Sequence, residues 1–127
     1  MILGFLLEEL RYVTSIELGK VSEKHRLASI TDSLTGLHNQ QWFFNYIYKD
    51  AGEFKNGDQV GCLFMDINKF KSLNDTYGHL FGNIVLERVG SILKETFPES
   101  ACRFGGDEFV VIEKNLSENE LFEIAYR

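Results

Sequence analysis

The sequence predicts one domain of the α/β (α+β) class, preceded by a long helix. Residues 3–30 have helical spacing, residues 60–65 form an apolar run of strand length, and residues 101–104 and 109–112 form two strand-like runs around a pair of glycines. The 127 residues are 44% hydrophobic and 25% charged, which is typical of a globular chain. Because helical and strand patterns alternate along the chain, we expect helices packed against a sheet.

The first helix carries a narrow apolar stripe with charged residues on its other face. The stripe consists of Leu3, Leu6, Leu10, Val13, Leu18, Val21 and Ala28. Such a helix either packs on its own domain or pairs with the same helix of a second chain, and both alternatives stay open. We expect residues 1–27 to be a signalling or dimerisation helix and residues 28–127 to be the globular domain.

A turn-rich segment, residues 31–39, separates this helix from the next one. Asn39 is a suitable N-cap for a helix over residues 40–50, whose apolar face is Trp42, Phe43, Tyr46 and Ile47. Residues 52–58 are polar and predict a loop.

The second half of the chain predicts two helices and three strands. The run 60–65 is typical of a central strand buried on both faces, and residues 84–97 predict a helix closed by Pro98. Residues 105–108 predict a tight hairpin turn in which the glycines adopt positive φ. The last helix begins at residue 116, with Ser117 as N-cap and Glu120 completing a capping box.

Composition narrows the function and the compartment. A formal charge of −6 and a pI near 5.0 argue against a general nucleic-acid binder. Cys62 and Cys102 lie in apolar runs, which favours buried thiols in a reducing compartment. No apolar run is long enough to span a membrane, and the N-terminus lacks the features of a signal peptide. We expect a cytoplasmic chain with no membrane contact.

Acidic residues stand where predicted strands end. Asp66 follows the first strand, and Asp107 with Glu108 occupies the hairpin tip. If the hairpin lies beside that strand, these carboxylates converge, and a divalent cation relieves their repulsion. Oxygen donors without His or Cys suit Mg²⁺ or Mn²⁺ better than zinc. An EF-hand is excluded because Phe70 and Lys71 occupy a ligand position and the required glycine.

Three motifs together resemble one family. The segment RFGGDEF at residues 103–109 resembles the hairpin that names the GGDEF family, the diguanylate cyclases. The segments DINKFKSLNDTYGH at residues 66–79 and DSLTGLHN at residues 32–39 resemble that family's metal-and-nucleotide segment and its opening motif. Because the three motifs occur in the family's order and at its separation, the probability that the resemblance arises by chance is very small.

The resemblance implies a fold, a reaction and a set of site residues. The fold is a central, mainly antiparallel sheet flanked by helices, similar to adenylate cyclases and polymerase palms. The reaction joins two GTP molecules into cyclic di-GMP and releases two pyrophosphates. The metal ligands are the side chains of Asp66 and Asp107 and the carbonyl of Ile67, with Glu108 as a supporting acid. Asp107 is also the proton acceptor, Lys71 offsets phosphate charge, and Asn74, His79 and Asn83 contact the nucleotide.

The sequence departs from the family at several positions. Asn83 replaces an aspartate that would accept both the N1 and N2 protons of guanine, so guanine selectivity is weakened, although Asn83 also suits the N-cap of a helix starting at residue 84. Residues 96–99 read TFPE instead of the inhibitory RxxD, so we expect no product-inhibition site. Residues 39–41 read NQQ where the family has NRR. The chain also ends before the family's C-terminal lysine and arginine, which predicts a fragment or a degenerate domain.

Three hypotheses follow. The first is a cyclase acting as a homodimer through the N-terminal helix, with GTP as substrate and an upstream sensor. The second is a catalytically degenerate or incomplete module for nucleotide binding or dimerisation. The third is a Mg²⁺-dependent nucleotidyltransferase that uses another purine.

Overall fold

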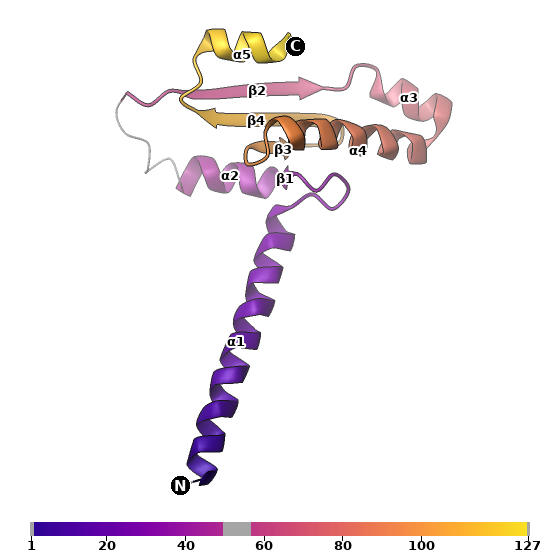
Figure 1. Ribbon diagram of the computed structural model, residues 1–127. Helices are drawn as coiled ribbons and strands as arrows, with labels where there is room; N and C mark the ends of the chain where they lie inside the picture. Colours follow the sequence, from indigo (N-terminus) through magenta and orange to yellow (C-terminus); the bar gives the residue numbers. More distant parts are fainter. Residues whose placement is uncertain (1, 50–56, 127) are drawn as a thin grey trace.

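The computed structural model describes residues 2–49 and 57–126. The elements follow in the order α1 (Ile2–Ile30), β1 (His38–Asn39), α2 (Gln40–Lys49), β2 (Val60–Asp66), α3 (Phe70–Tyr77), α4 (His79–Thr96), β3 (Ala101–Arg103), β4 (Glu108–Lys114) and α5 (Glu118–Ala125) (Figure 1). The α+β class with a leading helix is therefore confirmed. The loop predicted at residues 52–58 lies, apart from residues 57 and 58, outside the described residues.

The four strands form one sheet in the order β1-β3-β4-β2. The pair β1–β3 is parallel, whereas β3–β4 and β4–β2 are antiparallel. The expectation of a mainly antiparallel sheet is thus confirmed. The two-residue strand β1 was not predicted, because so short a strand has no periodicity to detect.

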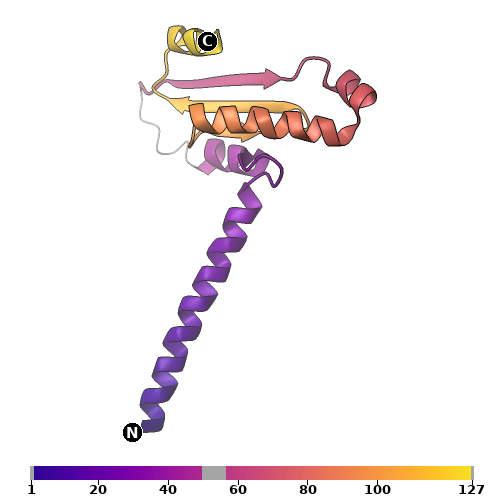
Figure 2. The same cartoon turned by 45° about the vertical axis from the view of Figure 1, so that its right-hand side comes forward.

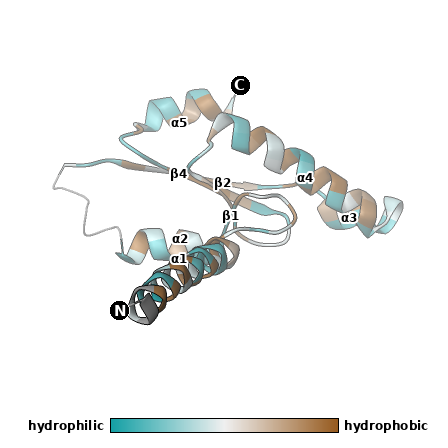
Figure 3. Ribbon diagram, turned by 60° about the horizontal axis from the view of Figure 1, so that its bottom comes forward, coloured by the Kyte–Doolittle hydropathy of each residue, from teal (hydrophilic) through white to brown (hydrophobic). Residues whose placement is uncertain are grey.

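Strand β4 is the centre of the core, because its side chains alternate between two apolar layers. Phe109 and Val111 pack with residues of α4, whereas Val110 and Ile112 pack with Phe43 of α2. All four are buried. Figure 3 shows α4 and α5 on one side of the sheet and α2 on the other.

The prediction that residues 60–65 form a central strand buried on both faces is wrong. Within the described sheet β2 lies at the edge and pairs only with β4. The side chain of Phe64 is 60% exposed, while Leu63 and Met65 on the opposite face pack against the core. An apolar run does not reveal how many neighbours a strand has, since that depends on distant segments.

Helix α1 extends away from the sheet (Figures 1 and 2), and its apolar side chains are exposed along almost its whole length. The alternative in which this helix packs on its own domain is therefore wrong except at its C-terminal end, where α1 contacts α2. Among the described helices none is long and apolar enough to cross a membrane.

The helix predicted to start at residue 84 in fact starts at His79 and follows the short helix α3. Gly78, with φ of 87°, joins the two helices, which is a conformation that glycine adopts without strain. Asn83 therefore lies inside α4, so its alternative role as an N-cap is wrong.

Two predicted caps are confirmed. Asn39 Oδ1 accepts a hydrogen bond from the Trp42 backbone N–H at 3.1 Å. Ser117 and Glu120 form the reciprocal capping box of α5.

Two other local expectations are wrong. Gly105 and Gly106 do not have positive φ; among the described glycines only Gly36, Gly57 and Gly78 do. The predicted hairpin itself is present, since β3 ends at Arg103, β4 begins at Glu108 and the two strands pair antiparallel. Cys62 is exposed, because β2 is an edge strand, and only Cys102 is buried.

Candidate active site

The pairing of β2 with β4 brings acidic residues to one end of the sheet. Asp66 lies directly opposite Glu108, and the Ile67 backbone N–H donates to the Asp107 carbonyl at 3.2 Å. A hollow of about 190 Å³ lies beside this pair, lined by Phe64, Met65 and Phe104 together with Asp66 and Glu108. The predicted proximity of Asp66 and the hairpin acids is thus present in the backbone register.

The loop after β2 is held in a strained conformation. Lys69 has a φ of 57°, in the left-handed region that non-glycine residues seldom adopt. This bend lets the Phe70 N–H donate to the Ile67 carbonyl at 3.2 Å. A carbonyl oxygen has two lone pairs, so Ile67 keeps one acceptor position for a further partner.

The hairpin turn does not need its glycines for a positive φ value. The N–H groups of Phe104 and Gly105 donate to the Glu108 carbonyl at 2.8 and 3.3 Å. A Cβ at position 105 would lie 2.7 Å from Glu108 Oε2, so the side chain of Glu108 folds back over the turn. Asp107 is half-buried within it.

The predicted nucleotide-contacting residues lie on α3 and α4. Lys71 is exposed in the first turn of α3, His79 begins α4, and Asn83 is exposed one turn later. Asn74 approaches the backbone of α4 so closely that a Cβ at position 82 would lie 1.8 Å from its Oδ1. Gly82 thus permits this contact.

Asn74 also has an unsatisfied acceptor. Its Oδ1 atom is buried and has no hydrogen-bond partner among the residues that the structure describes. Buried polar atoms are nearly always paired, so such an atom against Gly82 points to a missing donor at this place.

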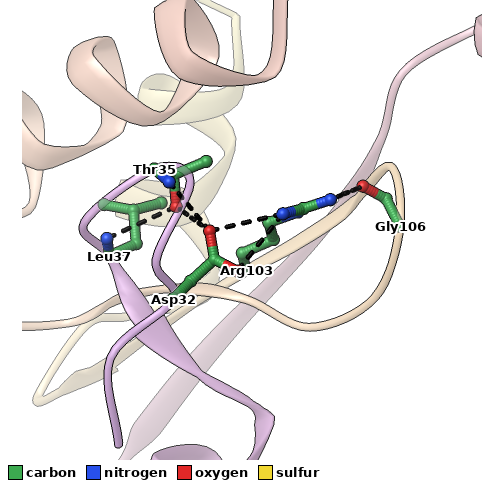
Figure 4. A network of polar contacts seen from close by, with 5 residues as sticks. All are labelled: Asp32, Thr35, Leu37, Arg103 and Gly106. Carbon is green, nitrogen blue, oxygen red and sulfur yellow. Dashed lines mark hydrogen bonds and ion pairs between the residues drawn. The ribbon is translucent and has the colours of Figure 1, made fainter. Parts of the chain in front are cut away.

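A polar network that the sequence did not reveal supports the hairpin (Figure 4). Arg103 Nη1 donates to both carboxylate oxygens of Asp32 at 3.2 and 3.3 Å, and its Nε and Nη2 donate to the Gly106 carbonyl at 3.1 and 2.7 Å. Both residues belong to quoted motifs, but 71 positions separate them in the sequence, so no spacing rule predicts the contact.

The electrostatics of Asp32 follow from this network. Burial alone raises the pKa of this carboxyl group. Hydrogen bonds from the Thr35 hydroxyl and N–H, together with the charge of Arg103, outweigh burial and leave the pKa below its usual value. Asp32 is therefore held as a carboxylate.

The side chains of the described residues do not form a complete metal-coordination site. The described residues contain no group of three or more His, Cys, Asp and Glu side chains arranged to hold a metal ion. A cation at Asp66 would therefore complete its shell with backbone, solvent or ligand oxygens. Mg²⁺ commonly binds in this way, through one or two carboxylates plus the phosphates of a substrate.

Comparisons with known proteins agree on one family for this chain. Residues 29–127 match the family model described as diguanylate cyclase, GGDEF domain. Diguanylate cyclase A of Treponema denticola is 38% identical over 105 residues, which cover 76% of this chain and 28% of that protein. The cyclic di-GMP phosphodiesterase PdeR of Escherichia coli is 34% identical over 85% of this chain and 16% of its own length.

A solved structure extends the similarity to the leading helix. The coiled coil and GGDEF domain of DgcB from Caulobacter crescentus, in complex with c-di-GMP, superposes with a TM-score of 0.76 at 28% identity. The match covers 91% of this chain and 63% of that one. The chain thus spans less than a third of the two curated relatives and less than two thirds of this structure.

Proposed function

Because this chain belongs to the GGDEF family of diguanylate cyclase domains, we propose that it takes part in condensing two GTP molecules into cyclic di-GMP and two pyrophosphates. The observation that carries the proposal is the β2–β4 register, in which Asp66 faces Glu108 and the Asp107 carbonyl is tied to Ile67. Like charges placed directly opposite one another destabilise a sheet, so this end of the sheet favours a cation.

A divalent ion fits these residues. Asp66, Asp107 and the free lone pair of Ile67 offer only oxygen donors, which suits Mg²⁺ or Mn²⁺, and Glu108 supplies a further acid. When bound, such an ion neutralises phosphate charge and makes a hydroxyl more acidic.

In the proposed reaction the 3′-oxygen of one GTP forms a bond to the α-phosphorus of the other. The bond between the α-phosphorus and the bridging oxygen breaks, pyrophosphate leaves, and the Asp107 carboxylate accepts the 3′-hydroxyl proton. The Lys71 ammonium group offsets the charge that develops on the phosphate oxygens. A second transfer of the same kind closes the ring.

The base is proposed to bind at Asn74, His79 and Asn83. The side chain of Asn74 would turn its Oδ1, which lies buried against Gly82, toward a purine N–H. Asn83 has one acceptor and one donor arm where the family has a carboxylate, so a guanine hydrogen bond is lost at a cost of about 1–3 kcal/mol. GTP is therefore bound with weakened selectivity over other purine nucleotides.

The product has two-fold symmetry, so two chains must each present one nucleotide. We propose a homodimer that forms through α1, with residues 1–27 as the dimerisation helix and an upstream sensor that sets its orientation. The exposed apolar side chains of α1 support this proposal. We also propose a cytoplasmic location, where GTP is supplied.

A second candidate is a catalytically degenerate or incomplete GGDEF module that binds nucleotide or dimerises without turnover. Asn83 favours it, because its amide has one acceptor arm where the family's carboxylate would accept both guanine protons. In this case the Asn74 site binds nucleotide, but no product forms.

Mass spectrometry of the products separates the two candidates. The chain is incubated with Mg²⁺ and either GTP or ATP, alongside Asp107→Asn and the control Asp75→Asn on the exposed face of α3. Cyclic di-GMP that disappears in Asp107→Asn and persists in Asp75→Asn supports the cyclase. Calorimetric binding of GTP without any product supports a nucleotide-binding module, and absence of both contradicts the cyclase and the nucleotide-binding module and leaves dimerisation alone.

A further inference from the structure

The connection between β2 and α3 joins the two halves of the candidate site. Strand β2 ends at Asp66 and α3 begins at Phe70, so a short turn separates the acidic end of the sheet from the helix that carries Lys71 and Asn74 (Figure 1). The conformation of this turn therefore determines how the acids and the helix lie relative to each other.

The turn places a lysine where glycine or asparagine is usual. The Phe70 N–H donates to the Ile67 carbonyl at 3.2 Å, and Lys69, at the third position of this turn, has φ of 57° and ψ of 30°. A type II turn requires a positive φ at its third position, which glycine and asparagine adopt most readily. For other L-residues this left-handed conformation is sterically disfavoured.

The side chain of Lys69 gives no reason for this conformation. It is exposed, and it makes no hydrogen bond that caps α3. The backbone of Lys69, in contrast, is used, because its carbonyl accepts a hydrogen bond from the Leu73 N–H at 3.0 Å in the first turn of α3. The conformation of Lys69 is thus tied to the path of the backbone.

Both ends of the turn are anchored. Ile67 and Phe70 pack against the apolar layer between α4 and the sheet. The ring of Phe70 reaches α4, since a Cβ at position 82 would lie 3.2 Å from its Cζ. The Ile67 N–H donates to the Asp107 carbonyl at 3.2 Å. Strained residues persist where their surroundings fix them in this way, and such places are often functional sites.

Asn115 provides an internal comparison. Among the described residues other than glycine, only Lys69 and Asn115 have a positive φ, which is 64° at Asn115. Asn115 follows β4 at the end of the sheet opposite to Asp66, and asparagine tolerates the left-handed region. The residue that is poorly suited to its conformation is the one beside the candidate metal ligands.

We propose that Lys69 is a positioning residue whose left-handed backbone, and not its ammonium group, holds the Ile67 carbonyl in place next to Asp66 and sets the direction of α3. The use of that carbonyl by a divalent cation rests on the proposed function. The dependence of the turn on the backbone of Lys69 does not.

Substitutions that separate backbone from charge test the proposal in the full chain without nucleotide. Lys69→Gly and Lys69→Asn remove the charge but tolerate a positive φ. Lys69→Val also removes the charge, but its β-branched side chain strongly disfavours the left-handed region. Asn115→Val introduces the same conflict at the far end of the sheet and is the matched control.

Amide hydrogen exchange reports on the turn itself. We expect Lys69→Val to accelerate exchange of the Phe70 amide about tenfold, and Lys69→Gly and Lys69→Asn to keep it within about threefold of the wild type. The Val111 amide in β4 should exchange at the wild-type rate in all three variants. Asn115→Val should leave the Phe70 amide unchanged.

Titration with Mn²⁺ alone reports on the site. Paramagnetic broadening of the Ile67 and Asp107 amide signals gives the dissociation constant. We expect Lys69→Val to raise this constant about tenfold, and the other three variants to stay within about twofold of the wild type. Recovery of Mn²⁺ binding in Lys69→Asn and Lys69→Gly distinguishes the backbone from the side chain.

Several results would contradict the proposal. If Lys69→Gly and Lys69→Asn lose as much as Lys69→Val, the ammonium group is responsible. If Lys69→Val behaves like the wild type, or if Asn115→Val accelerates the Phe70 amide equally, the backbone of Lys69 has no specific role. A wild-type chain that does not bind Mn²⁺ contradicts the cation of the proposed function, and exchange of the Phe70 amide then decides the backbone role alone.

Discussion

At the scale of single residues, the two cysteines differ although they share a face of the sheet. Cys102 lies on β3 beneath α2 and is fully buried, whereas Cys62 lies on the edge strand β2 and is exposed. Burial, with a contribution from the negative charge of Asp32, raises the pKa of Cys102 to about 12. Burial also raises the pKa of Cys62. Reactivity depends on the accessible thiolate, so accessibility separates the two.

We therefore predict that one thiol per chain reacts with a maleimide under native conditions and two react in guanidinium. Peptide mapping should place the native label on Cys62, and Cys62→Ser should abolish it. The Cys102→Ser variant should label like the wild type, provided that it is folded. Rapid native labelling of Cys102 would contradict the packing described for α2.

Gly90 illustrates a glycine required by close packing. A Cβ at this position would lie 2.7 Å from Thr35 Cβ, a β-branched side chain on a short, hydrogen-bonded turn that has little room to move. We expect Gly90→Ala to lower the free energy of unfolding by about 1–3 kcal/mol, measured by denaturant titration. Gly19→Ala, which meets no atom within 4 Å on α1, is the control and should be neutral or stabilising.

At the scale of elements, α5 depends on its N-terminal cap. The Ser117 hydroxyl oxygen accepts from the Glu120 N–H at 3.4 Å, and Glu120 Oε2 accepts from the Ser117 N–H at 2.8 Å. Helix α5 has only eight residues and contacts β2 through side chains such as Leu121. So short a helix has little stability without a cap and tertiary contacts.

Ser117→Ala should destabilise α5 by about 1 kcal/mol, which is a roughly fivefold acceleration of amide exchange in its first turns. Exchange in β4 should not change, because the contacts of α5 with the sheet are mainly with the edge strand β2. Ser91→Ala, which removes a hydroxyl from an exposed site on α4, is the matched control. Uniform acceleration across α5 and β4 would indicate instead that α5 unfolds together with the core.

Features that depend on neighbouring residues, such as helix caps and helical periodicity, were predicted well from the sequence. Contacts between segments far apart in the chain were predicted poorly. The caps Asn39 and Ser117 and the periodicity of α1 and α2 involve neighbours within four residues, so the sequence contains the whole interaction. The edge position of β2 and the contact of Arg103 with Asp32 depend on segments about 50 to 70 residues apart. Helix α3 was missed because its polar residues obscure the periodicity, and the first turn of α4 was missed because its apolar residues Leu80 and Phe81 are exposed.

The candidate site shows the same division. Motif resemblance selected Asp66, Asp107 and Glu108, and the sheet register brings their backbones together. That Gly82 makes room for Asn74 was not predictable, because it depends on how closely α3 and α4 approach. The expectation that Gly105 adopts a positive φ was also wrong, and a Cβ there would meet the flexible side chain of Glu108.

At the scale of the whole molecule, stability should depend on the protonation of His38. Its Nε2–H donates to the Glu99 carbonyl at 3.1 Å, and its ring stacks on Trp42. Burial, and to a smaller degree the charge of Lys94, lowers the pKa of His38, while the contact with Glu99 opposes this. The folded state thus binds the proton less tightly than the unfolded state, whose histidine pKa is about 6.5.

The free energy of unfolding should therefore be highest above pH of about 6.5 and decrease as the pH falls through the lower folded-state value. His38→Gln should remove this decrease between about pH 7 and pH 5, since glutamine can still donate to Glu99 but does not titrate. Denaturant titration at several pH values measures the difference, and His25→Gln on the exposed part of α1 is the control. If the free energy of unfolding of His38→Gln depends on pH in the same way as that of the wild type, His38 is not the cause of the decrease.

The fold also favours the assembly of two chains, because α1 exposes a row of large apolar side chains to solvent. Leu6, Leu10 and Leu18 are each at least half exposed on a helix of 29 residues with few contacts to its own domain. Pairing with a second copy would bury these side chains in both chains, and each buried side chain would contribute about 1.5–3 kcal/mol.

Leu10→Glu should therefore weaken self-association by about a hundredfold or more, measured by sedimentation equilibrium. Glu17→Gln, on the same helix, should leave it within about threefold. A wild-type chain that sediments as a monomer at about 100 µM, far above a micromolar dissociation constant, would show that α1 does not supply the dimer and that the two-site reaction requires another interface.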